Sequence, residues 1–87
     1  KFSKAAYINT AKPKEKADMI MKDLERGVTG ISARGMYSGQ DKLMLFCVVN
    51  KKEIVMLKEK VDEIDPEAFV IVTDAREVHG EGFIEKK

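Results

Sequence analysis

An uninterrupted apolar run at residues 42–49, KLMLFCVV, constrains the fold of this chain more than any other feature. Beyond its first lysine, the side chains are apolar at odd and at even positions, so a strand built from the run has no polar face. This pattern is typical of a central strand that is covered on both sides. The run AFVIVT at residues 68–73 repeats it near the end of the chain. We therefore expect a sheet that contains both runs as strands.

The first part of the chain predicts a strand, a helix and a second strand. Residues 4–9, KAAYIN, form a short and mostly apolar segment, which favours a strand. Pro13 suits the first turn of a helix, and Gly27 suits the residue just after its end. Residues 28–35 alternate loosely and predict the second strand. The apolar stripe of the predicted helix is Ala17, Ile20, Met21 and Leu24, and the residues away from it are Lys14, Lys16, Lys22 and Asp23.

The second part predicts a turn, the strand 42–49, a second helix and a final strand. Residues 36–41, MYSGQD, have the composition of a turn. Asn50 is a good N-cap residue, and Glu53 completes the pattern of a capping box. The helix ends before Pro66, because the residue that precedes a proline avoids the α region. The buried stripe of this helix is Ile54, Leu57, Val61 and Ile64.

The predicted order of elements is β-α-β-β-α-β. Right-handed crossovers fold this order into a four-stranded antiparallel sheet with both helices on one face. We therefore predict an α+β fold of the ferredoxin-like, two-layer sandwich type. A length of 87 residues fits one such domain, which we expect to span residues 1–87.

One face of the sheet in such a sandwich remains open, and the apolar strands have no polar residues for it. An exposed apolar patch of this size usually marks an interface, so we expect a homodimer or homotrimer that covers the open face. Of the adjacent residues Leu45 and Phe46, one faces the helices and one faces the partner, and the sequence leaves open which. The two sides of the strand are Leu43, Leu45, Cys47 and Val49 on one face, and Met44, Phe46 and Val48 on the other.

Composition narrows the classes of function. Sixteen Lys and Arg residues nearly cancel fifteen Asp and Glu residues, which argues against a nucleic-acid binder driven by charge. No apolar run approaches the roughly 20 residues that span a bilayer, and no stretch has the features of a signal peptide. Cys47 lies within the apolar run, which favours a buried, unreactive thiol. Because the chain begins at Lys1 without a methionine, we expect it to be a fragment of a longer protein.

Several motifs together resemble a known bacterial family. The motifs are ERGVT, ARGMYSG, CVVNKKEI, IDPEAFVIVTD and EVHGEGF, and the similarity extends from about Ala5 to Phe83. They resemble the C-terminal domain, of unknown function, of YitT-family bacterial membrane proteins. The resemblance implies a transmembrane domain upstream and a location on the cytoplasmic side of the membrane. The predicted plan is also similar to the PII signalling proteins, a likeness of fold that identifies no ligand.

Two glycine-containing segments form the candidate site. In the turn between the middle strands, Arg34 and Lys42 suit a phosphate or carboxylate group, and Tyr37 suits a flat ring. In DAREVHGEGF at 74–83, Phe83 also suits a ring, and the segment matches the family motif. We expect this segment to be ordered, to dock against a neighbouring subunit and to border a ligand pocket. The candidate ligand-binding residues are Arg34, Gly35, Tyr37, Gly39, Lys42, Glu77, His79, Gly80, Gly82 and Phe83.

Other kinds of site find little support in the sequence. His79, flanked by Glu77 and Glu81, is the chain's one histidine, and there is no cysteine pair. We therefore predict no metal site and no cofactor. The same residues also have an explanation that needs no ligand. In it, the glycines only turn the chain and the phenylalanine only closes the edge of the core.

Two functions remain open at this stage. The first is a non-catalytic regulatory or sensor domain that binds a small anionic metabolite or nucleotide at residues 35–41 and 76–83. The second is a purely structural module whose self-association assembles the membrane protein. An enzyme ranks last, because the sequence has no positioned acid, base, nucleophile or metal set.

Overall fold

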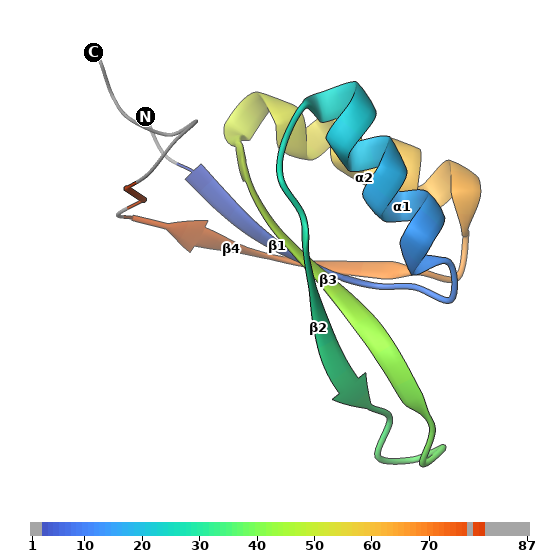
Figure 1. Ribbon diagram of the computed structural model, residues 1–87. Helices are drawn as coiled ribbons and strands as arrows, with labels where there is room; N and C mark the ends of the chain where they lie inside the picture. Colours follow the sequence, from blue (N-terminus) through green and yellow to red (C-terminus); the bar gives the residue numbers. More distant parts are fainter. Residues whose placement is uncertain (1–2, 77, 80–87) are drawn as a thin grey trace.

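A computed structural model describes residues 3–76, 78 and 79 of the chain. The order of elements is the predicted β-α-β-β-α-β, with the first helix in two parts (Figure 1). The elements are β1 Ser3–Asn9, α1 Pro13–Met19, the π-helix η1 Ile20–Leu24, β2 Thr29–Arg34, β3 Asp41–Asn50, α2 Lys51–Ile64 and β4 Phe69–Ala75.

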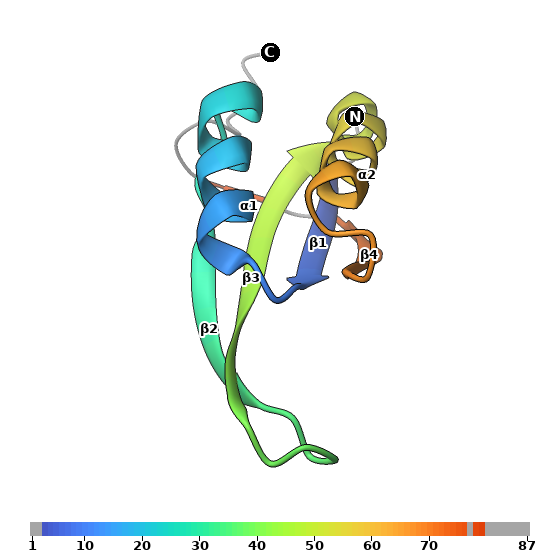
Figure 2. The same ribbon diagram turned by 90° about the vertical axis from the view of Figure 1, so that its right-hand side faces the viewer.

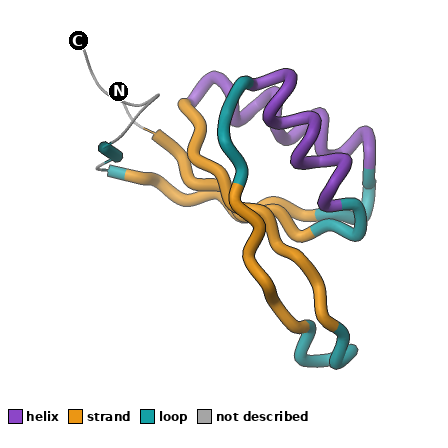
Figure 3. The backbone as a smooth tube through the Cα atoms, viewed as in Figure 1, coloured by secondary structure: helices purple, strands orange, loops and turns teal. Residues whose placement is uncertain are grey.

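The four strands form one antiparallel sheet in the order β2-β3-β1-β4. Both helices lie on the same face of this sheet, as the two perpendicular views show (Figure 1, Figure 2). The predicted ferredoxin-like sandwich is therefore confirmed. The hairpin of β2 and β3 extends past the helices, so its outer half has no helix over it (Figure 3).

The strand register decides which residues of β3 face the helices. Ile8 pairs with Leu45, and Tyr7 pairs with Phe46. Leu45 is 2% exposed and belongs to the core under the helices, whereas Phe46 is half-buried on the open face. The core consists of Ala6, Ile8, Met19, Ile20, Leu24, Leu45, Cys47, Val49, Ile54, Leu57 and Val61.

The open face of the sheet is apolar over its central strands. Tyr7 and Phe46 are flanked on it by Ile71, which pairs with Tyr7. Phe69 and Ile71 remain 54% and 49% exposed, because no part of the described chain covers them. Side chains on this face include Tyr7, Ile31, Met44, Phe46, Val48, Phe69 and Ile71.

The predicted start and end of α2 are both confirmed. The Asn50 side chain accepts a hydrogen bond from the Glu53 N–H at 2.8 Å, and the Glu53 carboxylate accepts one from the Asn50 N–H at 2.8 Å. This reciprocal pair satisfies two donors that the start of a helix leaves free. At the other end the backbone of Asp65, just before Pro66, is extended.

The first helix differs from its predicted pattern. Lys16, which the spacing places outside the apolar stripe, is fully buried, while Met21 is 48% exposed. The inward face of α1 already runs through Lys16 and Met19, which are both buried, and the helix changes to i→i+5 hydrogen bonding at Ile20, which widens the next turn. The helix also ends earlier than predicted: Glu25, and not Gly27, takes the left-handed conformation, with φ of 56°.

Candidate functional site

The turn between β2 and β3 holds most of the candidate residues that the structure describes. The Arg34 guanidinium donates to the Asp41 carboxylate at 3.2 Å, across the base of the turn. The Gly35 N–H donates to the Gln40 carbonyl at 2.9 Å, and the Gly39 N–H donates to the Gly35 carbonyl at 2.7 Å. Backbone bonds thus close the turn without any contribution from Tyr37, whose side chain is fully exposed.

The conformation of this turn explains why glycine occupies two of its positions. Gly39 has a φ of 76°, a conformation that strains residues with a Cβ atom. A Cβ on Gly35 would lie 2.8 Å from the Ser38 hydroxyl oxygen, which is too close. The Ser38 hydroxyl in turn accepts from the Gln40 N–H at 3.2 Å. The glycines are therefore explained by the turn alone.

Within one chain, the β2–β3 turn and His79, the one described candidate of the second segment, follow from opposite ends of the sheet. Asn9 pairs with Met44 and with Phe69 at the end near the turn. The other end, where Ala75 pairs with Ser3, leads to His79, which is exposed. The remaining candidates, Glu77, Gly80, Gly82 and Phe83, lie outside the described residues.

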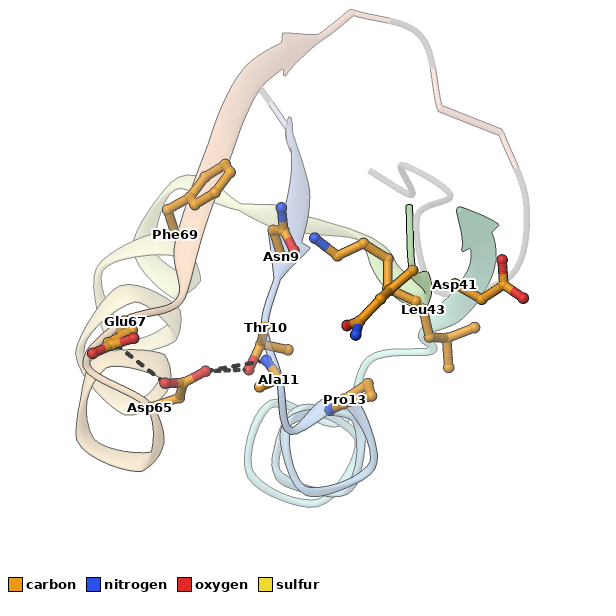
Figure 4. Close-up of a pocket in the computed structure, with 11 residues that line it drawn as sticks. Asn9, Thr10, Ala11, Pro13, Asp41, Leu43, Asp65, Glu67 and Phe69 are labelled. Atoms are coloured by element: carbon orange, nitrogen blue, oxygen red, sulfur yellow. Dashed lines mark hydrogen bonds between the residues drawn. The ribbon is translucent and has the colours of Figure 1, made fainter. Parts of the chain in front are cut away.

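A groove of about 540 Å³ lies at the base of the β2–β3 hairpin (Figure 4). Four segments meet there: the end of β1, the start of β3, the loop after α2 and the start of β4. Lys42 is the predicted residue that this groove includes. The lining residues are Asn9, Thr10, Ala11, Pro13, Gln40, Asp41, Lys42, Leu43, Asp65, Glu67 and Phe69.

Asp65 holds two walls of this groove together (Figure 4). Its Oδ2 accepts from the Thr10 hydroxyl at 2.7 Å and from the Ala11 N–H at 3.2 Å. Its Oδ1 accepts from the Glu67 N–H at 3.1 Å. The hydrogen bond from Thr10 is the main cause that lowers the pKa of Asp65, and the nearby charge of Lys16 acts in the same direction. A buried carboxylate thus joins the loop after β1 to the loop after α2.

Sequence reasoning missed this side of the groove. It interpreted Asp65 only as the last residue before a helix-ending proline. An aspartate next to Pro66 is also well placed to accept from the N–H two residues on, as it does with Glu67. That local signal predicts the turn, but the contact with Thr10 joins residues 55 positions apart and has no local signature.

Metal ligands do not gather in the part of the chain that the structure describes. Among residues 3–76, 78 and 79, no three His, Cys, Asp or Glu side chains come together in a way that could hold an ion. Neither helix in this part of the chain has both the length and the apolar character that crossing a membrane requires.

Residues 26–80 match the family model of DUF2179, an uncharacterised protein conserved in bacteria. The chain is 47% identical over 81 residues to the UPF0750 membrane protein YvjA of Bacillus subtilis, covering 93% of this chain and 29% of YvjA. It is 31% identical over 75 residues to the UPF0750 membrane protein YitT of the same organism, covering 86% of this chain and 27% of YitT. The chain therefore spans less than a third of the length of these relatives.

Two solved structures are similar in fold. One is the crystal structure of a DUF2179 protein from Eubacterium ventriosum, with a TM-score of 0.72, 35% identity, and coverage of 82% of this chain and 97% of that one. The other is a putative PII-like signalling protein from Thermus thermophilus, with a TM-score of 0.56, 18% identity, and coverage of 86% and 88%. At that identity the second likeness is one of fold alone.

Proposed function

We propose a function for this chain from one premise, that it belongs to the DUF2179 family of uncharacterised bacterial proteins. Its relatives include UPF0750 membrane proteins that are more than three times its length, and its fold is PII-like. The proposed function is that of a non-catalytic regulatory domain of such a membrane protein, on the cytoplasmic side. It senses a small ligand and transmits its binding to the transmembrane domain upstream, and it binds no nucleic acid.

The groove beside the β2–β3 hairpin is the observation that carries this proposal. Its acidic residues are partly engaged already: Asp41 pairs with Arg34, and Asp65 accepts three hydrogen bonds. Lys42, by contrast, forms no ion pair within the described residues, so its ammonium group is available to an anionic group. Asn9 and Gln40 add amide groups, and Phe69, which is 54% exposed, adds a ring.

These side chains suit a small anionic metabolite or nucleotide. Lys42 supplies the charge for a phosphate or carboxylate, and Phe69 supplies an apolar surface for a base or ring. Glu67 is the one acidic residue of the groove whose carboxylate has no hydrogen bond from another described residue, and it selects against ligands with excess negative charge nearby. We propose that residues 76–83 of a second subunit complete the pocket for this ligand.

Self-association is therefore part of the proposal, and the open sheet face supports it. Tyr7, Phe46 and Ile71 form a row across β1, β3 and β4 on a face without a helix. A second copy of the chain has the same apolar face, and contact between the two faces removes both of them from water. If the domain binds no ligand, this face supports the second candidate, a module that only assembles the membrane protein.

A thermal-shift screen with nucleotides, cyclic dinucleotides and amino acids tests the ligand. A compound at about 100 times its dissociation constant adds about 2.7 kcal/mol to the free energy of unfolding. We expect Lys42→Ala to abolish that shift and Lys22→Ala, an exposed lysine outside the groove, to retain it. A shift that both variants retain would contradict this site.

Light scattering separates the two candidate functions. A wild-type oligomer with no thermal shift from any compound supports assembly alone. A domain that stays monomeric at high concentration contradicts self-association, whatever the screen finds.

A further inference from the structure

A second hollow, of about 310 Å³, lies at the opposite end of the sheet from the groove. Four charged residues line it: Lys4, Lys51, Asp74 and Arg76. They come from the start of β1, the start of α2, and the end of β4 with the residue that follows it, which meet at one end of the molecule (Figure 1). Three separate elements therefore bring three cations together around one cavity.

The register explains why these side chains converge. Lys4 pairs with Asp74 across β1 and β4, and with Val49 across β1 and β3. Lys4 shares the face of β1 that carries Ala6, which is buried under the helices. Its side chain thus points to the helix side of the sheet, where α2 begins one residue after Asn50.

The charges in this hollow do not cancel. Lys4 forms an ion pair with Asp74, and the Lys4 hydrogen bond is the main cause that lowers the pKa of that carboxyl. Lys51 and Arg76 have no carboxylate within 4 Å in the described part of the chain. The described lining residues of the hollow therefore carry a net charge of +2, in a chain whose formal net charge is +1.

The start of α2 adds to the positive potential. Lys51 is the first residue of a 14-residue helix, whose N-terminus carries a partial positive charge. The nearby carboxylate of Glu53 already has two partners, since it accepts from the Asn50 N–H in the capping box and from the Arg26 guanidinium at 3.0 Å. It therefore does not neutralise Lys51.

We propose that this hollow binds a phosphate group through Lys51 and Arg76, with Lys4 as a third cation. Arginine binds phosphate with two parallel hydrogen bonds, and lysine binds it as a point charge. Two sources have this chemistry, namely the headgroup of an anionic phospholipid and a free phosphorylated metabolite. The site is separate from the groove at Lys42, so it stands or falls independently of the proposed sensor function.

The two sources are distinguished by two probes. Pyrophosphate is titrated into isotope-labelled protein while NMR follows the Lys51 amide and the Arg76 side chain. Cosedimentation is measured with phosphatidylcholine vesicles that contain, or lack, phosphatidylglycerol. Saturable shifts with pyrophosphate identify a free phosphate ligand, and binding to the anionic vesicles alone identifies a lipid headgroup.

Charge reversal tests the residues. We expect Lys51→Glu with Arg76→Glu to weaken binding of the responding probe about twentyfold or more, since each Lys or Arg at an anionic surface contributes roughly fivefold. The matched control, Lys22→Glu with Lys58→Glu, changes the net charge equally at exposed positions elsewhere and should have a much smaller effect. Circular dichroism verifies that each variant is folded.

Asp74→Asn gives an independent result of opposite sign. This variant frees Lys4 and removes the one carboxylate among the described lining residues, so it should strengthen binding severalfold. The proposal is overturned if neither probe binds the wild-type domain, if both double variants weaken binding equally, or if Asp74→Asn weakens it.

Discussion

The rings of Tyr7 and Phe46 lie 5.0 Å apart and are tilted by 52° to each other on the open face of the sheet. Each is only half-buried, although they pair across β1 and β3, the two central strands. A tilted aromatic pair at this distance is favourable in itself, but it leaves apolar surface in contact with water. The pair marks the centre of the surface that a second subunit would cover.

The contrast between Leu45 and Phe46 tests that surface. Leu45→Asp places an unpaired charge in the core, so it should cost more than about 4 kcal/mol and unfold the domain. Phe46→Asp places the charge on the open face, so the domain should stay folded and become monomeric. Circular dichroism and light scattering measure both results. Two variants that are folded and oligomeric, or two that are unfolded, would contradict this assignment of faces.

The main features of the fold were predictable because they depend on local patterns. The apolar run around Leu45 indicates a central strand, and Asn50 with Glu53 indicates where the next helix begins. Which side of β3 faces the helices was not predictable, because both sides are apolar. The register with β1 decides it, and register depends on residues about 40 positions away.

The candidate site was predictable only in part. Gly35, Gly39 and Lys42 mark the turn and one wall of the groove from local composition. The opposite wall depends on Asp65 and Thr10, whose contact across 55 residues has no signature in either segment. The turn and His79 likewise lie far apart because the strands that lead to them run to opposite ends of the sheet. A sequence motif does not reveal the direction of a strand.

The capping box of α2 should make a measurable contribution to stability. Asn50→Ala removes the acceptor for the Glu53 N–H and should lower the free energy of unfolding by about 1 kcal/mol. Lys58→Ala, at an exposed position in the same helix, should change it by less than about 0.5 kcal/mol. Urea denaturation measures both. Equal effects of the two substitutions would show that the cap is not formed in solution.

The thiol of Cys47 should react slowly in the folded domain. Burial raises its pKa to about 11, so little thiolate forms near neutral pH. Labelling with a thiol-specific disulfide reagent should be much slower in buffer than in guanidinium chloride. Similar rates in the two conditions would place Cys47 at the surface, contrary to its 2% exposure.

The hydrogen bonds to Asp65 predict loss of stability in acid. The pKa of this carboxyl is lower in the folded state than its usual value of 3.8, so its stabilising effect is present above that value and is lost as the pH falls through the folded pKa. Asp65→Asn should therefore be less stable than wild type near neutral pH, and the difference should shrink below about pH 4. Asp18→Asn, at an exposed position in α1, is the control, because it leaves the contact with Thr10 intact. A difference between wild type and Asp65→Asn that does not change with pH would refute this role of the charge.

The buried ammonium of Lys16 should destabilise the fold, because its Nζ has no hydrogen-bond partner among the described residues. Burial is the main cause that lowers its pKa below 10.5; Lys12 acts in the same direction, while Asp65, Glu15 and Asp62 oppose the shift. The unfolded state thus holds this proton more tightly, and stability should rise with pH between the lowered folded pKa and 10.5. Lys16→Met keeps the apolar stem and removes the charge, so near pH 7 it should stabilise the domain by roughly 1–3 kcal/mol. That gain should shrink as the pH approaches about 10, whereas Lys14→Met, at an exposed position in the same helix, should give no such trend. Urea denaturation across this pH range measures these effects. If Lys16→Met destabilised the domain at every pH, Lys16 would not be buried without a partner in solution.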